Sequence, residues 1–259
     1  MGHERIGFLP RSKSWKAIIG KLASYDGDID SVRLIAENTL RAIRRTYEFI
    51  SFDESVIKAI SFLTKISFSA KQTDQVDYLN ANGYAVDSKI SLHSLMSSVH
   101  NLITTEDGSL EINKIAKDAA LQAIINYQQK HSSNQLSFFG EESSNIWKSV
   151  GSGAAFCELA RSFFAAFTDK QIKYYLDREA ASSIGDYVKL ESFTQQLSEH
   201  TAMISEHAIN ISEIMQSFAA AWFNKNAILT LPNEEQIKGF LKHSFQKLRE
   251  EFRREGEDK

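Results

Sequence analysis

The first arrangement whose residue types and spacing could bind a metal ion is the series Asp26, Asp28, Asp30 and Glu37. Carboxylates at the first, third, fifth and twelfth positions are typical of an EF-hand calcium loop. The sixth position, which needs a glycine for a sharp turn, is Ser31, and the eighth position is a cation, Arg33. We therefore interpret the carboxylates as charges that stabilise a helix N-terminus, with Asp30 capping a helix from Ser31 to Ile50.

Two histidine pairs are candidates for zinc ligands, namely His93 with His100 and His200 with His207. The members of each pair are seven residues apart on a predicted helix, which separates them by about 10.5 Å along the axis. Two ligands that each bond one zinc ion at about 2.0 to 2.1 Å cannot span that distance. We therefore predict that the four imidazoles lie at the surface or at its boundary and bind no metal.

The only cysteine, Cys157, could be a nucleophile, but it cannot form an intrachain disulfide or a multi-cysteine zinc site. Its neighbours Phe156 and Ala160 favour a small buried apolar residue. The triplet from Gly151 to Gly153 lacks the strand and the Gly-Lys-Ser/Thr ending of a phosphate loop, so we expect Ser152 or Gly153 to cap a helix. No catalytic residue, cofactor or metal site is predicted, and the enzymatic alternative is a site whose residues converge only in space.

A polar, serine-rich segment contains the pentapeptide Gln135, Leu136, Ser137, Phe138 and Phe139. This pentapeptide resembles the short motif by which bacterial replication and repair proteins bind the DNA sliding clamp, with Phe138 in place of the usual leucine. The resemblance covers these five residues alone and implies that they bind a partner, with the Gln135 amide forming hydrogen bonds and the apolar side chains entering pockets. The alternative is that Leu136, Phe138 and Phe139 pack on the core of this protein, because large apolar groups seldom stay in water as a cluster.

Residues 1–50 are richer in cations than the rest of the chain, although the whole protein has a net charge of −3. That net charge argues against a surface that binds nucleic acid everywhere, but it leaves room for a local basic patch. The candidate phosphate contacts are Arg11, Lys13, Lys16, Arg41, Arg44 and Arg45. The alternative is an ordinary solvated helix face, since cations form a binding site only when they gather on one side.

Composition predicts an all-α fold, because the two prolines lie near the ends and 12 glycines are few for a sheet with tight turns. We expect a bundle of eight to ten helices with a long C-terminal helix. The predicted organisation is an N-terminal helical region (1–131), a flexible linker (132–151) and a C-terminal helical region (152–259), which together could be one continuous domain. No signal peptide or membrane span is predicted, so we expect a cytoplasmic protein without a membrane partner.

The stretch from Ser152 to Gly185 has the densest apolar pattern, and the other helices are expected to gather around it. Its apolar row is Phe156, Leu159, Ala160, Phe163, Phe164 and Phe167. Thr168 with Gln171 has the form of a capping box, which predicts a break there. Residues 186–224 show a seven-residue apolar pattern typical of a long helix with a coiled-coil seam. Asn233 with Gln236 is expected to cap the last helix, whose predicted inward residues are Ile237, Leu241, Phe245, Leu248 and Phe252.

These patterns favour a non-enzymatic interaction or adaptor subunit of a multi-protein assembly, such as those of bacterial antiviral defence or DNA processing. The expected partner is another protein, for example an ATPase, a nuclease or a sliding clamp. One alternative is a protein associated with DNA or the clamp, which would use the basic N-terminal region and the segment 135–139. The other alternative is an enzyme whose site the sequence does not reveal.

Overall fold

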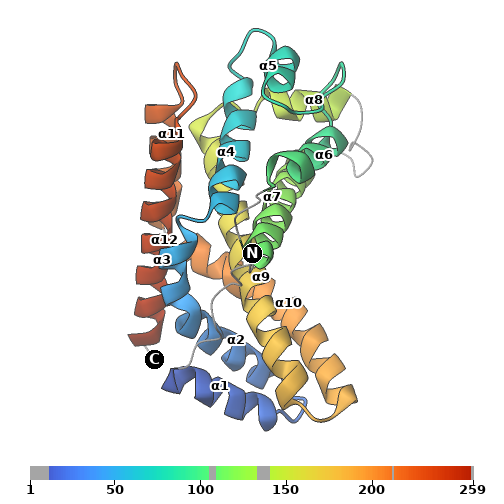
Figure 1. Cartoon of the computed structure of the whole chain (residues 1–259), viewed down its shortest axis with the longest axis vertical. Helices are drawn as coiled ribbons and strands as arrows, with labels where there is room; N and C mark the ends of the chain where they lie inside the picture. The colour runs from blue at the N-terminus through green and yellow to red at the C-terminus, as the bar shows by residue number, and fades with distance from the viewer. Residues whose placement is uncertain (1–11, 105–108, 133–140, 212, 258–259) are drawn as a thin grey trace.

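The computed structural model describes residues 12–104, 109–132, 141–211 and 213–257 (Figure 1). These residues are mostly helical and contain no strand, which confirms the all-α prediction. Ten of the α-helices among them have eight or more residues. The helices are α1 (Lys13–Ala23), α2 (Ile29–Ile43), the 3-10 helix η1 (Arg44–Thr46), α3 (Tyr47–Ile50), α4 (Glu54–Ser69), α5 (Gln75–Ala81), α6 (Leu92–Leu102), α7 (Leu110–His131), α8 (Glu141–Lys148), α9 (Gly153–Ser183), α10 (Tyr187–Ile211), α11 (Glu213–Asn226) and α12 (Glu234–Glu257).

Helix α9 runs through the middle of the molecule and contacts α7, α10 and α11 (Figure 1). This position confirms that the other helices gather around the apolar stretch predicted from the sequence. Every residue of its predicted apolar row is buried. The row meets aromatic rings of the C-terminal helices, and the ring centroids of Phe156 and Phe223 are 4.8 Å apart in a stacked arrangement. The ring of Phe164 meets that of Phe245 edge to face at 5.2 Å. Such pairs contribute stability beyond the apolar area that they bury.

The N-terminus of α9 is set by the Gly-Ser-Gly triplet, as predicted. Ser152 is the N-cap, and its hydroxyl accepts a hydrogen bond of 3.1 Å from the backbone N–H of Ala155. Gly153 lies against α11 so closely that an added Cβ atom would be 2.8 Å from the carbonyl oxygen of Ala220 and 2.5 Å from Oδ1 of Asn224. Only glycine allows the two helix backbones to approach this closely.

The predicted break at Thr168 is wrong, because α9 continues without interruption from Gly153 to Ser183. Thr168 is buried, and its hydroxyl accepts a hydrogen bond of 3.2 Å from the hydroxyl of Tyr47. Gln171 is also buried, and its Nε2 donates to the hydroxyl of Thr46 at 3.1 Å. Both side chains therefore bind the segment η1–α3 and do not cap a helix.

The acidic series before α2 stabilises the helix N-terminus, but the cap is Asp28 and not Asp30. The carboxylate of Asp28 accepts a hydrogen bond of 3.1 Å from the backbone N–H of Ser31, and the helix starts at Ile29. The last member of the series, Glu37, forms an ion pair of 3.2 Å with Arg33 one turn away. The carboxylates thus serve the helix itself, in line with the interpretation drawn from the sequence.

The residues of the predicted coiled-coil seam belong to α10 and α11, on either side of residue 212, which lies outside the described residues. Both helices pack on α9. Half of the seam residues, namely Ile204, Ala208, Ile211 and Met215, have side chains outside the described ones, so the partner of the seam stays a prediction. Helix α12 follows, and its cap is reciprocal as predicted. Asn233 accepts from the backbone N–H of Gln236, and Gln236 accepts from that of Asn233, each at 2.9 Å. All five predicted inward residues of α12 are buried.

Part of the predicted linker, residues 141–148, forms α8, and Trp147 within it is fully buried. A single cluster of buried apolar residues includes members of both predicted helical regions, for example Ile60 of α4 and Phe164 of α9.

Among the described helices, none combines the length and the apolar character that crossing a membrane requires.

Candidate functional site

A groove of about 620 Å³ lies between the segment η1–α3 and helix α12, and we call it the α3–α12 groove. Residues 44–52 form one wall and residues 242–253 form the other, so segments nearly 200 positions apart meet here. The lining residues are Arg44, Tyr47, Glu48, Ser51, Phe52, Lys242, Phe245, Gln246, Arg249, Glu250 and Arg253. The volume is within the range of about 300 to 1,000 Å³ that is usual for ligand sites.

The floor of the groove consists of two buried aromatic rings, Tyr47 and Phe245, which stack with centroids 5.3 Å apart. The hydroxyl of Tyr47 donates to Thr168 of the central helix α9. Burial raises the pKa of the Tyr47 phenol well above its usual range, more than the hydrogen bond with Thr168 lowers it, so this side chain stays neutral. Contacts with α9 hold both rings in place, and the floor is therefore a rigid part of the core.

Cations outnumber carboxylates in the walls, with four against two. Glu48 forms an exposed ion pair with Arg249, with 3.4 Å between Oε2 and Nη1. Glu250 is bound by Lys247 at 3.2 Å, and Lys247 lies outside the groove. Exposed ion pairs of this kind are worth only about 0.2 to 1 kcal/mol, so an anionic ligand could displace the carboxylates at little cost. The lining residues therefore carry a net formal charge of +2, four cations less two carboxylates, which favours an anionic ligand.

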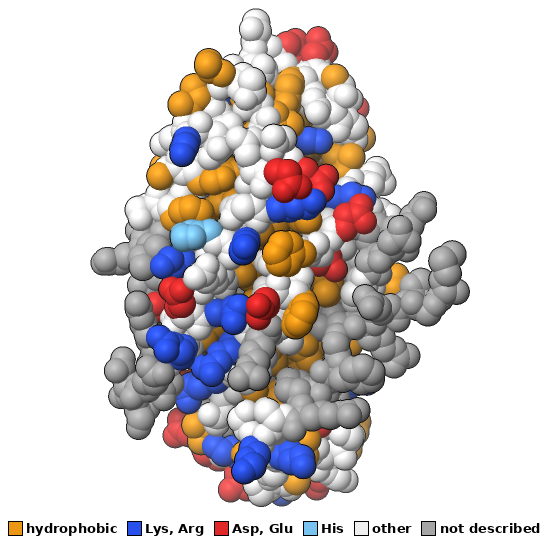
Figure 2. Space-filling view, turned by 60° about the vertical axis from the view of Figure 1, so that its left-hand side comes forward, with side chains coloured by type: hydrophobic (Ala, Val, Ile, Leu, Met, Phe, Trp, Pro, Cys, Tyr) orange, Lys and Arg blue, Asp and Glu red, His pale blue; other side chains and the backbone are white. Residues whose placement is uncertain are grey.

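Two phenylalanines in or just after α3 are exposed to solvent, Phe49 by 79% and Phe52 by 57%. Phe49 is in the short helix α3, and Phe52 follows it in the chain and lines the groove. Figure 2 shows the side of the molecule that carries α3 and α12, where Lys and Arg side chains gather in the lower half next to hydrophobic ones. Large apolar side chains exposed together mark binding surfaces more often than single exposed ones do.

The predicted phosphate contacts are spread over several elements. Lys13 and Lys16 are exposed on α1, and Arg41 of α2 donates from Nη1 to Oδ1 of Asn38 at 3.4 Å. Four of the predicted phosphate-contact residues have described side chains, and among these four only Arg44 lines the α3–α12 groove. Two others are not described: Arg11 and the side chain of Arg45 lie outside the described residues.

Sequence reasoning missed the cations of α12, namely Lys242, Arg249 and Arg253. Each directly follows a buried residue of the inward face, Leu241, Leu248 or Phe252. Consecutive helical residues are about 100° apart, so residues that follow the buried row form a stripe along its edge. The spacing of these three cations at i, i+7 and i+11 could have predicted this stripe from the sequence.

The pentapeptide from Gln135 to Phe139 lies outside the described residues, so its clamp-like character stays a prediction. Residues 133–140 separate α7 from α8, and the described chain on both sides of them is helical.

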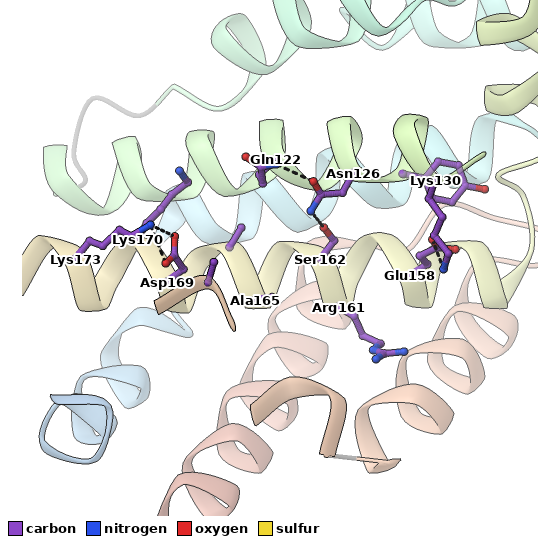
Figure 3. Close-up of a pocket in the computed structure, with 13 residues that line it drawn as sticks. Gln122, Asn126, Lys130, Glu158, Arg161, Ser162, Ala165, Asp169, Lys170 and Lys173 are labelled. Carbon is purple, nitrogen blue, oxygen red and sulfur yellow. Dashed lines mark hydrogen bonds and ion pairs between the residues drawn. The ribbon is translucent and has the colours of Figure 1, made fainter. Parts of the chain in front are cut away.

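A second groove, of about 510 Å³, is lined by side chains of α7 and α9 and by Ala202 of α10 (Figure 3). Its charged groups largely bind one another. Glu158 contacts Lys130 at 2.8 Å and His131 at 3.1 Å, and Lys173 contacts Asp169 at 3.0 Å. Partial burial acts to raise the pKa of Glu158, but the hydrogen bonds and charges of Lys130 and His131 outweigh it and lower the pKa. This groove is a polar seam that joins α7 to α9.

In the centre of that seam, Gln122 donates to Asn126 at 2.7 Å, and Asn126 donates to the hydroxyl of Ser162 at 2.9 Å (Figure 3). The small side chains of Ala165, Ala166 and Ala202 also line this groove. We assign this groove a structural role, since hydrogen bonds and ion pairs within and between the two helices engage most of its polar lining residues.

The other candidates from the sequence do not form a reactive site in the described structure. Burial raises the pKa of the Cys157 thiol, with Arg161 acting in the opposite direction, so the thiol is less reactive than a free cysteine. His93 and His100 are exposed on α6. In the described part of the chain, no group of three or more His, Cys, Asp or Glu residues could hold a metal ion.

The α3–α12 groove is therefore the best candidate site, because it joins a buried aromatic floor, four cations against two carboxylates, and the exposed ring of Phe52. Its shape and chemistry have to be interpreted from its own residues, since no protein-family model, curated protein or solved structure was found to match the chain.

Proposed function

We propose that this protein is a non-enzymatic interaction subunit, which brings an anionic partner into a multi-protein assembly through the α3–α12 groove. The observation that supports the proposal is the exposed Phe52 in a groove lined by four cations, with a second exposed ring, Phe49, in the adjoining helix α3. Leaving such rings in water costs free energy, and burying them against a partner would recover it. The surplus of cations selects a partner of opposite charge.

The groups in the groove suit binding better than catalysis. Its described lining contains no His, Cys or Asp, and its two glutamates are bound by Arg249 and Lys247. The hydroxyl of Ser51 donates to the backbone carbonyl of Glu48 at 2.9 Å, so it is held by its own helix. A nucleophile paired with a general base, which a covalent mechanism needs, is not present among these side chains.

Affinity purification of the tagged full-length chain from its native cells tests this proposal. Proteins would be identified by mass spectrometry, and nucleic acid would be extracted from the same fraction. We expect partner material with the wild-type chain and much less with Phe49→Ser/Phe52→Ser. An ATPase or a nuclease in the fraction would identify the kind of assembly.

The matched control is Leu110→Ser/Leu229→Ser, which removes two exposed apolar side chains outside the groove. The control should recover as much partner as the wild type. Purification of the wild-type chain alone as a stable monomer would refute the proposal, as would equal recovery with the groove variant and the control.

A further inference from the structure

We infer that the anionic partner of the α3–α12 groove is single-stranded nucleic acid, an inference that rests on the proposed function. The apolar side chains of the groove are all aromatic: Tyr47 and Phe245 are buried in its floor, and Phe52 is exposed in its wall. Phe49 of α3 does not line the groove but is also exposed, so Phe52 and Phe49 are the rings that bases could reach. No Leu, Ile, Val or Met is among the lining residues. Grooves that receive the apolar face of a peptide helix are usually lined by aliphatic residues and methionine, whereas bases stack on aromatic rings.

The cations are arranged to follow a phosphate backbone. Lys242, Arg249 and Arg253 lie along one edge of α12 over about 16 Å, since each residue advances the helix by about 1.5 Å. Arg44 is on the opposite wall. A groove with cations along its length and aromatic rings for the bases is the usual arrangement in proteins that bind single strands.

Single strands fit the exposed rings better than a duplex does. In a duplex the base faces are covered by neighbouring bases, so they cannot stack on a protein side chain without unstacking. Phe49, in the short helix α3, and Phe52, two residues after its end, both have exposed side chains that a base could contact. The Arg249–Glu48 ion pair is exposed and 3.4 Å long, and a phosphate could replace Glu48 as the partner of the guanidinium.

Fluorescence anisotropy with the full-length chain tests this inference. The probes are fluorescein-labelled dT20, rU20 and a 20-base-pair duplex, titrated at 50 and 200 mM salt. If three or four phosphates are neutralised, the affinity for a single strand should fall about 20- to 50-fold over that fourfold increase in salt. We expect both single strands to bind more tightly than the duplex.

Two pairs of variants separate stacking from charge. Phe49→Leu/Phe52→Leu keeps apolar side chains but removes the ring faces, and it should weaken dT20 binding about tenfold or more. Phe49→Trp/Phe52→Trp should retain binding. Lys242→Glu/Arg253→Glu should lower the affinity for dT20 and make that affinity less dependent on salt concentration. The control Lys189→Glu/Lys225→Glu changes the net charge by the same amount at exposed lysines outside the groove, so it should have little effect. Circular dichroism and melting curves would verify that all variants fold.

Three results would overturn the inference: no single-strand binding at 50 mM salt, unchanged dT20 affinity in the Phe→Leu variant, or displacement of dT20 by polyglutamate of equal charge concentration. The proposed function would survive these results if the wild-type chain recovers a protein partner after nuclease treatment and Phe49→Ser/Phe52→Ser does not. Both ideas fail together if the groove variants change neither measurement.

Discussion

The contact between Gly153 and α11 leads to a sharp prediction about stability. In Gly153→Ala, the new Cβ atom would be 2.8 Å from the Ala220 carbonyl oxygen and within 2.7 Å of two Asn224 side-chain atoms. The Asn224 side chain is exposed and can rotate, but the carbonyl belongs to the helix backbone of α11 and can move only with that helix. Overpacking of this kind costs about 1 to 3 kcal/mol.

An opposing effect has to be subtracted, because alanine favours a helix over glycine by about 0.5 to 1 kcal/mol in a helix interior. Gly153 is the first residue of α9, so its gain is smaller than the interior value. The steric cost is the larger effect, and we expect Gly153→Ala to lower the free energy of unfolding by about 1 to 2 kcal/mol. For a chain of this size, the melting temperature should fall by about 2 to 8 °C.

Gly239→Ala is the matched control. Gly239 is exposed within α12, and an added Cβ atom would meet nothing within 4 Å. The same substitution there should raise the free energy of unfolding by about 0.5 to 1 kcal/mol, because only the helix preference changes. Urea unfolding followed by circular dichroism measures both variants. Equal changes in the two variants, or a stabilised Gly153→Ala, would show that α11 does not approach α9 as the structure indicates.

Three further outcomes follow from the buried contacts. Thr168→Val removes the acceptor of the Tyr47 hydroxyl and should lower the free energy of unfolding in urea by about 1 to 3 kcal/mol. The double variant with Tyr47→Phe should recover part of that loss. If the losses of the two single variants add up in the double variant, the hydrogen bond is contradicted. Ser152→Ala removes the α9 cap and should cost about 0.5 to 2 kcal/mol, measured by thermal melting, and an unchanged melting temperature would argue against this cap. The lowered pKa of Glu158 stabilises the fold above the ordinary carboxyl pKa of 4.5, and this stability is lost as the pH falls through the folded-state value. Glu158→Gln should therefore lose stability at neutral pH and show a weaker decline in acid, and parallel pH profiles would contradict this assignment.

The local sequence pattern predicted the structure correctly where contacts within one segment determine it. The apolar row from Phe156 to Phe167 and the inward row of α12 were predicted correctly, because a helix of 3.6 residues per turn places such residues on one face. The caps at Ser152 and at Asn233 with Gln236 were also predicted, since each is a contact within three residues.

Local pattern failed where a distant segment competes for the same side chain. Thr168 and Gln171 have the form of a helix cap, yet Tyr47 and Thr46 bind them from more than 100 residues away. Because Thr168 and the Nε2 of Gln171 bind these distant residues and do not cap a helix, α9 continues through the core. The sequence contains no local signal that distinguishes a cap from such a contact.

The candidate site shows the same division between local and tertiary information. The sequence by itself determined that Arg44 lies in a basic region and that α12 has an inward apolar face flanked by other residues. Only the tertiary structure decided that η1 and α3 lie against α12, which joins Arg44 to Lys242, Arg249 and Arg253 across one groove. Two surface segments nearly 200 residues apart become neighbours because both pack on α9, through Tyr47 on one side and Phe245 on the other.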